Sequence, residues 1–152
     1  MSEKIKTKAF YNYEIPGDWE IEELGQLTIL CTNGFVGKAK ESYDEGAGAI
    51  LYIQGFNVTE GGFNLHNIKR VKRSFHEKNK KSRLVEGDLL TIQTGDIGVT
   101  TVVTKELEGA NCHALVISRL KKEIAHPYFY VQFFNSERGR RILKTIETGS
   151  TM

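Results

Sequence analysis

The residues of this chain that are best suited to catalysis are a cysteine beside a histidine and two aspartates that follow glycines. Cys112 and His113 could form a nucleophile pair or bind a metal. They are adjacent in a segment with the pattern of a strand, where successive side chains point to opposite faces, so a shared ligand set is not expected. Asp88 and Asp96 could act as paired carboxylates, but a Gly-Asp pair is typical of a turn in which aspartate bonds to its own backbone. We expect structural roles for the cysteines and turn roles for Asp88 and Asp96.

Known catalytic motifs are missing from the sequence. The two prolines, Pro16 and Pro127, stand far apart, so the Asp/Asn-Pro-Pro-aromatic motif of amino-methyltransferases cannot be formed. No acidic residue is followed two positions later by lysine, and neither the Walker phosphate loop nor the Gly-x-Gly-x-x-Gly fingerprint occurs. The remaining histidines, His66, His76 and His126, show no metal-ligand spacing with the cysteines. A catalytic centre of known phosphate or methyl chemistry is therefore not expected, and we expect no metal and no cofactor.

A dense run of positive charge between residues 67 and 83 is the clearest sign of a binding function. It contains eight lysines and arginines against one acid, Glu77. Lysine and arginine neutralise phosphates and supply salt-dependent affinity for nucleic acid. The predicted phosphate contacts are Lys69, Arg70, Lys72, Arg73, Lys78, Lys80, Lys81 and Arg83, with Lys38 and Lys40 as weaker candidates. A solvated surface without a ligand is the alternative.

Polar residues at expected loop and turn positions are candidates for base contacts. Asparagine and glutamine pair bidentately with adenine, and arginine with guanine. Most phenylalanines and tyrosines lie in a predicted helical segment or near predicted strands, so few remain to stack on single-stranded bases. Duplex DNA is therefore the favoured partner. The base-contact candidates are Asn33, Gln54, Asn57, Gln93, Thr94 and His113.

These residues are expected to be positioned by a central hairpin within residues 84–103. Two short runs rich in β-branched residues flank Gln93-Thr94-Gly95-Asp96, a pattern typical of two strands joined by a tight turn. Gly87, Asp88, Gly95 and Gly98 are expected to shape the backbone of the hairpin and its entry. Other strands must pack on the hairpin, because it cannot bury its apolar face alone.

The remaining elements follow from local patterns along the chain. Strands are predicted at 27–30, 50–53 and 110–120, and residues 67–83 are expected to be a loop. Trp19, Ile21 and Leu24 are expected to pack against the core. Pro127 suits the first turn of a helix, and a second helix, capped near Ser136, is expected to end at Thr148. The predicted fold is α+β: a single domain with a mainly antiparallel, twisted or barrel-like sheet and a C-terminal helical pair.

Composition fits this architecture. The chain has 152 residues, of which 39% are hydrophobic and 26% are charged, so one domain with a core of its own is expected. The net charge is only +2, so binding to nucleic acid depends on where the charge lies. No apolar run reaches the roughly 20 residues of a membrane helix, and the start lacks a secretory signal. We expect residues 1–13 to be a mobile lead, residues 14–152 to form the domain, and the location to be cytoplasmic, with reduced cysteines.

Short motifs in a fixed order suggest a family. They are Ile15-Pro16-Gly17-Asp18-Trp19 with Leu24-Gly25, Tyr52-Ile53, Leu84-x-x-Gly87-Asp88-Leu89-Leu90 with Gly95 and Gly98, Asn111 before a strand that runs to Leu120, and Gly149-Ser150-Thr151. Each motif is degenerate alone, but together they span nearly the whole chain. In this set the chain resembles a target recognition domain from the specificity subunit of a type I restriction-modification enzyme.

The resemblance implies a reader of duplex DNA whose chemistry is carried by other chains. Members of that family usually have two such domains, separated by long helices that form a coiled coil and dock modification (methyltransferase) subunits. Each domain reads one half of a split target, and the restriction subunit joins through the modification subunit. This sequence ends at Met152, where the family would continue into a spacer helix. We therefore expect one recognition domain of a longer subunit, or a truncated product.

Two other classes stay open. The domain could be the recognition part of a fused methyltransferase-nuclease, with its chemistry on residues outside this sequence. It could also be a protein-interaction module that docks through the aromatic segment from Phe129 to Phe134, although core packing of these aromatics is the favoured interpretation.

Overall fold

A four-stranded antiparallel sheet forms the centre of the molecule. The computed structural model describes residues 4–6 and 14–146. The order of the central sheet is β3 (Thr28–Asn33), β11 (Leu115–Leu120), β8 (Leu89–Ile92) and β9 (Thr100–Val102). The predicted central hairpin is present as β8 and β9, which pair from Leu89↔Val102 to Thr91↔Thr100. Their connection is longer than the predicted tight turn, because the last bonds between the two arms join Ile92 to Gly98 and Val99.

A smaller sheet lies beside the central one and consists of β10 (Asn111–Cys112), β4 (Ile50–Ile53) and β7 (Lys69–Val71). β10 and β4 are parallel, whereas β4 and β7 are antiparallel. Two short antiparallel hairpins join β5 (Val58–Thr59) to β6 (Gly62–Phe63) and β1 (Lys4–Lys6) to β2 (Glu14–Pro16). The mainly antiparallel α+β class is confirmed. The barrel-like closure is not found, because the described strands form separate open sheets.

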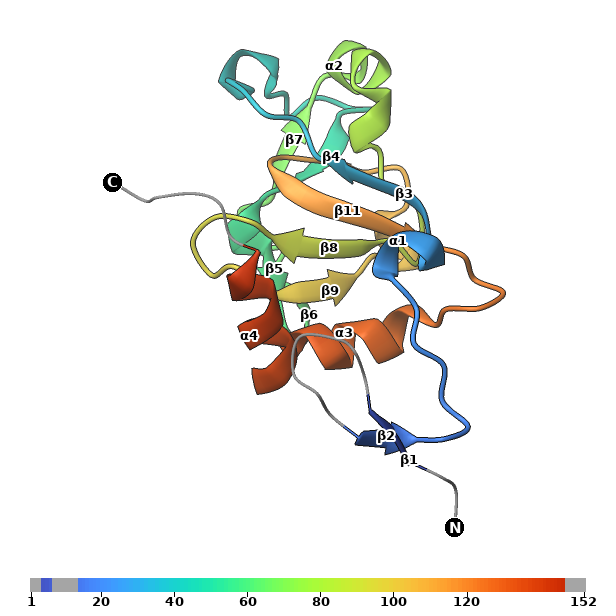
Figure 1. Ribbon diagram of the computed structural model, residues 1–152. Coiled ribbons are helices and arrows are strands. Elements are labelled where there is room, and N and C mark those ends of the chain that lie inside the picture. The colour runs from blue at the N-terminus through green and yellow to red at the C-terminus, as the bar shows by residue number, and fades with distance from the viewer. Residues whose placement is uncertain (1–3, 7–13, 147–152) are drawn as a thin grey trace.

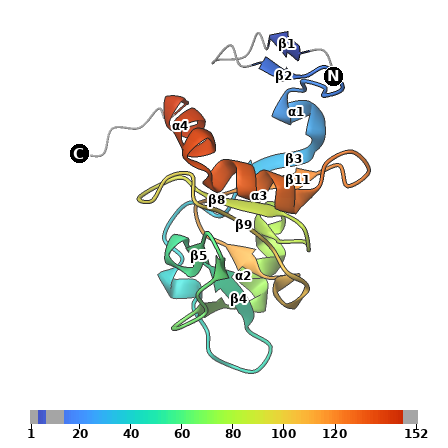
Figure 2. The ribbon, with the colours of Figure 1, turned by 90° about the horizontal axis from the view of Figure 1, so that it is seen from below.

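The helices are α1 (Leu24–Leu27), α2 (Arg73–Lys78), α3 (Pro127–Asn135) and α4 (Glu137–Thr145). Short 3₁₀ turns span η1 (Lys40–Ser42), η2 (Gly55–Asn57), η3 (Lys80–Ser82) and η4 (Lys105–Leu107). Figure 2 shows α3 on one side of the central sheet and β4, β5 and α2 on the other. In Figure 1, α2 and β7 lie at the top of the molecule, and α3 and α4 lie below the sheet.

The predicted helical pair is confirmed, and its local signals explain its ends. Pro127 occupies the first turn of α3, where its missing N–H removes no helical hydrogen bond. The Ser136 hydroxyl accepts a hydrogen bond from the Gly139 N–H and so caps α4. α4 ends at Thr145, and the predicted end at Thr148 and the motif from Gly149 lie outside the described residues.

The largest hydrophobic core lies between the two sheets. It includes Ile53, Leu84, Leu90, Leu115 and Ile117, all nearly inaccessible to solvent. A second cluster places α3 against the central sheet, where Val131 and Phe134 pack with Leu89, Val102 and Leu120. The amide of Asn135, at the end of α3, also exchanges two hydrogen bonds with the backbone of Thr100 on the edge strand β9.

Asp88 has the predicted turn role and a second role that the sequence did not indicate. Its carboxylate accepts a hydrogen bond from the Val85 N–H at 2.9 Å. The two carboxylate oxygens also accept from the Arg119 guanidinium at 2.7 and 2.8 Å, and the Asp88 side chain is fully buried. Gly87 and Gly98 have φ of +89° and +91°, which agrees with their predicted role in shaping the backbone.

Several expectations for single segments are wrong. Trp19, Ile21 and Leu24 are 56%, 50% and 37% exposed instead of packed in the core. The strand predicted over 110–120 is split into β10 and β11 at Ala114, whose φ is +46°. Residues 67–83 form β7, α2 and η3 instead of a loop. Of the predicted mobile lead, residues 4–6 pair with β2, and residues 1–3 and 7–13 lie outside the described residues.

Candidate nucleic-acid interface

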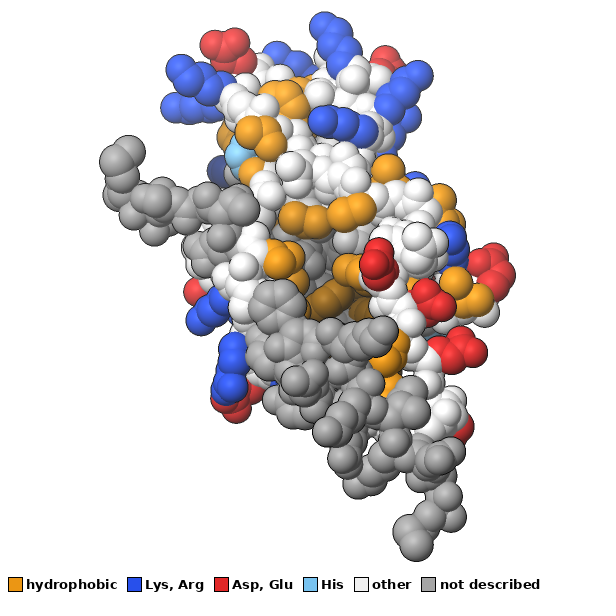
Figure 3. Space-filling model, in the orientation of Figure 1, with side chains coloured by type: hydrophobic (Ala, Val, Ile, Leu, Met, Phe, Trp, Pro, Cys, Tyr) orange, Lys and Arg blue, Asp and Glu red, His pale blue; other side chains and the backbone are white. Residues whose placement is uncertain are grey.

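The predicted phosphate contacts meet at one end of the molecule, which we call the basic end. It consists of Lys38, Lys40, Lys69, Arg70, Lys72, Arg73, Lys78, Lys80, Lys81 and Arg83. Figure 3 shows Lys and Arg side chains gathered at the top, over the part of the molecule that holds α2 and β7. All ten residues except Arg83 are classed as exposed. Within the described part of the chain, none of the ten forms a salt bridge. This end therefore presents positive charge that nearby carboxylates do not pair.

Backbone contacts bring Lys38 and Lys40 to the run at 69–83, although about 30 residues separate them in the chain. The Asp44 N–H donates to the Arg70 carbonyl at 3.1 Å, and the Lys72 N–H donates to the Ser42 carbonyl at 2.9 Å. The Lys72 ammonium also donates to the Glu41 carbonyl at 3.0 Å. These bonds hold the segment around η1 beside β7.

A small aromatic core supports the basic end. Phe75, on α2, makes edge-on contacts with Phe35 at 4.8 Å and with Tyr52 at 5.6 Å between ring centroids. Tyr52 and Val71 are fully buried in the same cluster. Because Phe75 packs α2 against this core, the lysines and arginines of α2 are held on an ordered helix.

Arg83 differs from the other nine cations. Its guanidinium donates two hydrogen bonds to the His76 carbonyl, at 2.9 and 3.0 Å, and the residue is half-buried. It therefore helps to join α2 to η3, and a phosphate contact is less accessible to it than to its neighbours.

Four of the base-contact candidates meet at one end of the central sheet, in what we call the polar row: Asn33, Gln54, Gln93 and His113. Strand register explains this meeting. Asn33 pairs with Val116, and Ile92, just before Gln93, pairs with Leu115, so the ends of β3 and β8 flank the start of β11. Since neighbouring strands lie about 4.8 Å apart, β3 and β8 are separated by roughly 10 Å, or about three base-pair steps.

The second sheet adds Gln54 and His113 to the same row. The His113 N–H donates to the Ile53 carbonyl at 2.8 Å, which places Gln54 next to His113 across β4 and β10. Asn33 is exposed, whereas Gln54, Gln93 and His113 are half-buried. Thr94 is exposed and follows Gln93 into the β8–β9 loop.

The His113 ring is held by Tyr52. The Tyr52 hydroxyl and His113 Nδ1 are 2.9 Å apart. Burial raises the pKa of Tyr52, and the nearby Tyr43 and Cys112 raise it further, so the phenol keeps its proton at neutral pH. Because a phenol can donate or accept, this contact fits either neutral tautomer of His113. When the phenol donates to Nδ1, the ring proton lies on Nε2, which is then a hydrogen-bond donor.

Asn57 does not fit its predicted role in base contact. Its side chain is fully buried, its Oδ1 accepts from the Gln54 N–H at 2.9 Å, and its Nδ2 donates to the Asn64 carbonyl at 2.8 Å. A side chain with both ends bonded inside the protein has no atom for a base, so the prediction for Asn57 is wrong. A polar residue in the turn after a predicted strand can be a structural asparagine or a base contact, and the local sequence does not distinguish the two.

A buried polar cluster under the basic end was not predicted. Asn111 is fully buried, and its side chain contacts the Ser82 hydroxyl, the Asn79 carbonyl and His76 Nδ1. Burial and then the charges of Arg83 and Arg73 lower the pKa of His76, which favours the neutral ring that this contact requires. The cluster ties α2 and η3 to β10.

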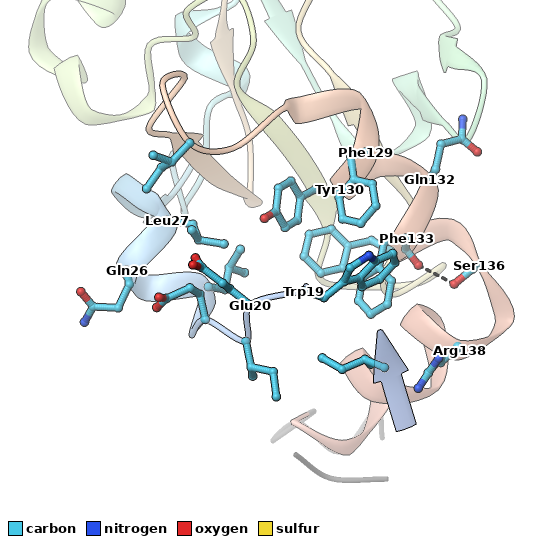
Figure 4. Close-up of a pocket in the computed structure, with 16 residues that line it drawn as sticks. Trp19, Glu20, Gln26, Leu27, Phe129, Tyr130, Gln132, Phe133, Ser136 and Arg138 are labelled. Atoms are coloured by element: carbon cyan, nitrogen blue, oxygen red, sulfur yellow. Dashed lines mark hydrogen bonds between the residues drawn. The ribbon is translucent and has the colours of Figure 1, made fainter. Parts of the chain in front are cut away.

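At the other end of the molecule, apolar side chains line a groove of about 1270 Å³. We call it the aromatic groove. It lies between the segment from 15 to 27 and the two C-terminal helices, and Trp19 reaches toward Phe133 across it (Figure 4). Phe129 is 57% exposed, whereas Val131 and Phe134 on the same helix are buried. The aromatic segment of α3 is therefore core on one face and groove on the other. The exposed residues Asp18, Glu20, Glu22 and Glu23 give the segment beside the groove a negative charge.

Cys112 has the predicted structural role. Cys112 is fully buried, and burial, with the charge of Asp88, raises its thiol pKa to about 12, which opposes formation of the nucleophilic thiolate. Among the described residues, His, Cys, Asp and Glu do not gather in a group of three or more that could hold a metal ion. None of the helices within 14–146 has the length and apolar character needed to cross a membrane.

Comparison with known proteins adds no assignment, since neither a protein-family model nor a curated protein matches this chain.

Proposed function

We propose that this protein is a sequence-specific reader of duplex DNA, and that it serves as a recognition domain of a type I restriction-modification specificity subunit. The observation that carries the proposal is the position of the polar row beside the basic end. Unpaired cations supply affinity for phosphates, and polar side chains at the adjoining sheet edge supply donors and acceptors for base edges. The domain itself is proposed to be non-catalytic and to act in the cytoplasm, where such systems meet DNA.

The proposed division of labour assigns separate residues to the two tasks. The nine exposed cations of the basic end contact phosphates and fix the protein on the duplex. Gln54 and Gln93 offer amides suited to adenine, and the Gln54 amide nitrogen also donates to the Tyr43 hydroxyl at 3.4 Å. His113 suits the acceptors of guanine in the tautomer that carries its proton on Nε2. Asn33 and Thr94 complete the base-contact set.

The test of phosphate binding is the salt dependence of duplex affinity for a Lys69→Ala/Arg73→Ala variant. Both side chains are exposed, and no hydrogen bond is recorded for either within the described residues. Each lost phosphate contact reduces the slope of log affinity against log salt by about 0.9, so the double variant should lose up to about 1.8. Lys121→Ala/Lys122→Ala, which follows β11 at the opposite end of the sheet, is the matched control and should keep the slope. Equal slopes for both double variants would refute the assignment.

Specificity requires a separate selection from a random duplex library. Enrichment of one short motif, corresponding to half of a split site, is the expected result. Salt-sensitive binding without enrichment would limit the domain to phosphate contact, and absence of binding at low salt would reject the function.

A modification subunit is the proposed protein partner, and the aromatic groove is the surface that supports this part of the proposal. The groove is mainly apolar, and Glu20 and Glu22 of the acidic segment also line it, which suits a partner helix with an apolar face and flanking lysines or arginines. The restriction subunit would then join through the modification subunit. If the domain acts only as a protein-interaction module, the same groove would be its working surface.

Two exposed phenylalanines, one in the aromatic groove and one outside it, allow partner binding to be tested separately from DNA binding. Phe129→Ala, at the groove, should weaken capture of the co-expressed modification subunit and leave duplex affinity unchanged. Phe56→Ala is the matched control, because Phe56 is 58% exposed against 57% for Phe129 and does not line the groove. Equal capture of the partner by both variants would exclude the groove as the docking site.

A further inference from the structure

Phe56 is an exposed aromatic residue that neither core packing nor the aromatic groove accounts for. It lies in η2, two residues after Gln54, and 58% of its surface is exposed. Other phenylalanines on this side of the molecule, such as Phe35 and Phe75, pack together in the aromatic core below the basic end. A single exposed apolar side chain is common on protein surfaces, so only its neighbours indicate whether it contacts a ligand.

The turn that carries Phe56 is held from both sides. On one side, the Asn57 side chain accepts from the Gln54 N–H at 2.9 Å, and the Asn57 N–H donates to the Gln54 carbonyl at 2.9 Å. On the other side, Asn57 and Asn64 exchange two hydrogen bonds of 2.8 Å each. Because the backbone on both sides of Phe56 is tied down, this turn has little backbone conformational entropy left to lose on binding.

Phe56 stands beside the polar row and close to the basic end. Gln54, which precedes it in the same capped turn, neighbours His113 in the row. On the other side of β4, Lys69 pairs with Tyr52 and supplies an exposed cation at the edge of the same sheet. A duplex that contacts Lys69 with a phosphate and Gln54 with a base would therefore bring the Phe56 ring to the same groove of the DNA.

We propose that Phe56 contacts the C5-methyl group of a thymine in the major groove, next to the base pair that Gln54 contacts. This inference rests on the proposed DNA-reading function and adds an apolar element to it. In the major groove only thymine presents a methyl group, and apolar side chains discriminate it by contact. Phe56 thereby becomes a specificity-determining residue that hydrogen-bonding patterns do not reveal.

The experiment compares thymine with deoxyuridine, which differs only by the missing methyl. Duplexes carrying the motif selected by the domain are prepared with each thymine replaced in turn, and affinities are measured for the whole chain and for Phe56→Ala. At one position the unaltered protein should lose about fourfold in affinity, the ratio that corresponds to about 0.8 kcal/mol for one buried carbon group. Phe56→Ala should bind the two duplexes equally, and Phe129→Ala should keep the fourfold difference.

The outcomes separate this inference from the proposed function. A selected motif without thymine, no effect of deoxyuridine at any position, or an unchanged effect in Phe56→Ala would overturn the role of Phe56 while sequence-specific binding stands. Failure of the selection itself would remove both. Since Phe56 is exposed, its replacement by alanine should leave the melting temperature nearly unchanged, and this is checked before affinities are compared.

Discussion

Replacement of Asp88 by asparagine tests how strongly one buried carboxylate holds the central hairpin. The Asp88 side chain is fully buried, and both of its oxygens accept hydrogen bonds from Arg119, at 2.7 and 2.8 Å. Removing one partner of a buried ion pair typically costs about 3–5 kcal/mol, because the other charge is left unpaired. Arg119 is 27% exposed and can be partly rehydrated, so we expect about 3 kcal/mol, at the lower end.

The assay is urea unfolding followed by fluorescence, with Asp96→Asn as the matched control. Both aspartates follow a glycine, but Asp96 is exposed and no ion pair is recorded for it within the described residues. We expect Asp96→Asn to change the free energy of unfolding by less than about 0.5 kcal/mol. For a chain of this length, the Asp88 variant should melt about 6–12 °C lower. A loss below about 1 kcal/mol, or equal losses in the two variants, would refute the argument that the buried ion pair makes these two turns different.

Two further predictions concern glycine and pH. Gly98→Ala should destabilise the fold by about 1–3 kcal/mol more than Gly95→Ala: both positions have positive φ, but at Gly98 the added methyl lies 3.2 Å from side chains of α4, whereas at Gly95 it meets nothing within 4 Å. Equal losses in urea unfolding would show that α4 yields freely. Burial and two neighbouring arginines lower the pKa of His76 in the folded chain. Below about pH 6.5 the unfolded chain therefore binds a proton more readily than the folded chain, and the free energy of unfolding decreases as the pH is lowered. His76→Gln should reduce the loss of unfolding free energy between pH 7.5 and 5.5, the exposed His66→Gln should not, and identical losses in both variants would contradict this assignment.

The basic end and the polar row differ in how far local sequence reveals them. The cations at 69–83 are recognisable by their density, and almost all are exposed, because charged side chains rarely leave water unless they are paired. The base-contact candidates were chosen only as polar residues at turns. Four of them meet through strand register, but Asn57 is buried and bonded within the protein. An asparagine side chain can bond a base or its own backbone in a turn, and its surroundings in the fold determine which of the two it does.

The aromatic groove reverses a prediction made from hydrophobicity alone. Trp19, Ile21 and Leu24 are apolar enough for a core, yet they are exposed along the segment that leads to β3. Apolar residues are favoured inside but are not all accommodated there, since burial requires another surface to pack against. The space opposite these residues is the groove itself, beside α3.

Features that depend on neighbours in the chain can be predicted from the sequence. The runs of β8 and β4, the proline at the start of α3 and the serine cap of α4 follow from local periodicity and backbone chemistry. The partners of Asp88, the burial of Asn57 and the approach of Asn33, Gln93 and His113 at one end of the central sheet depend on the tertiary structure. The physical reason is that strand pairing and side-chain burial depend on segments far apart in the chain, where one polar residue type can meet water, a base or a buried partner.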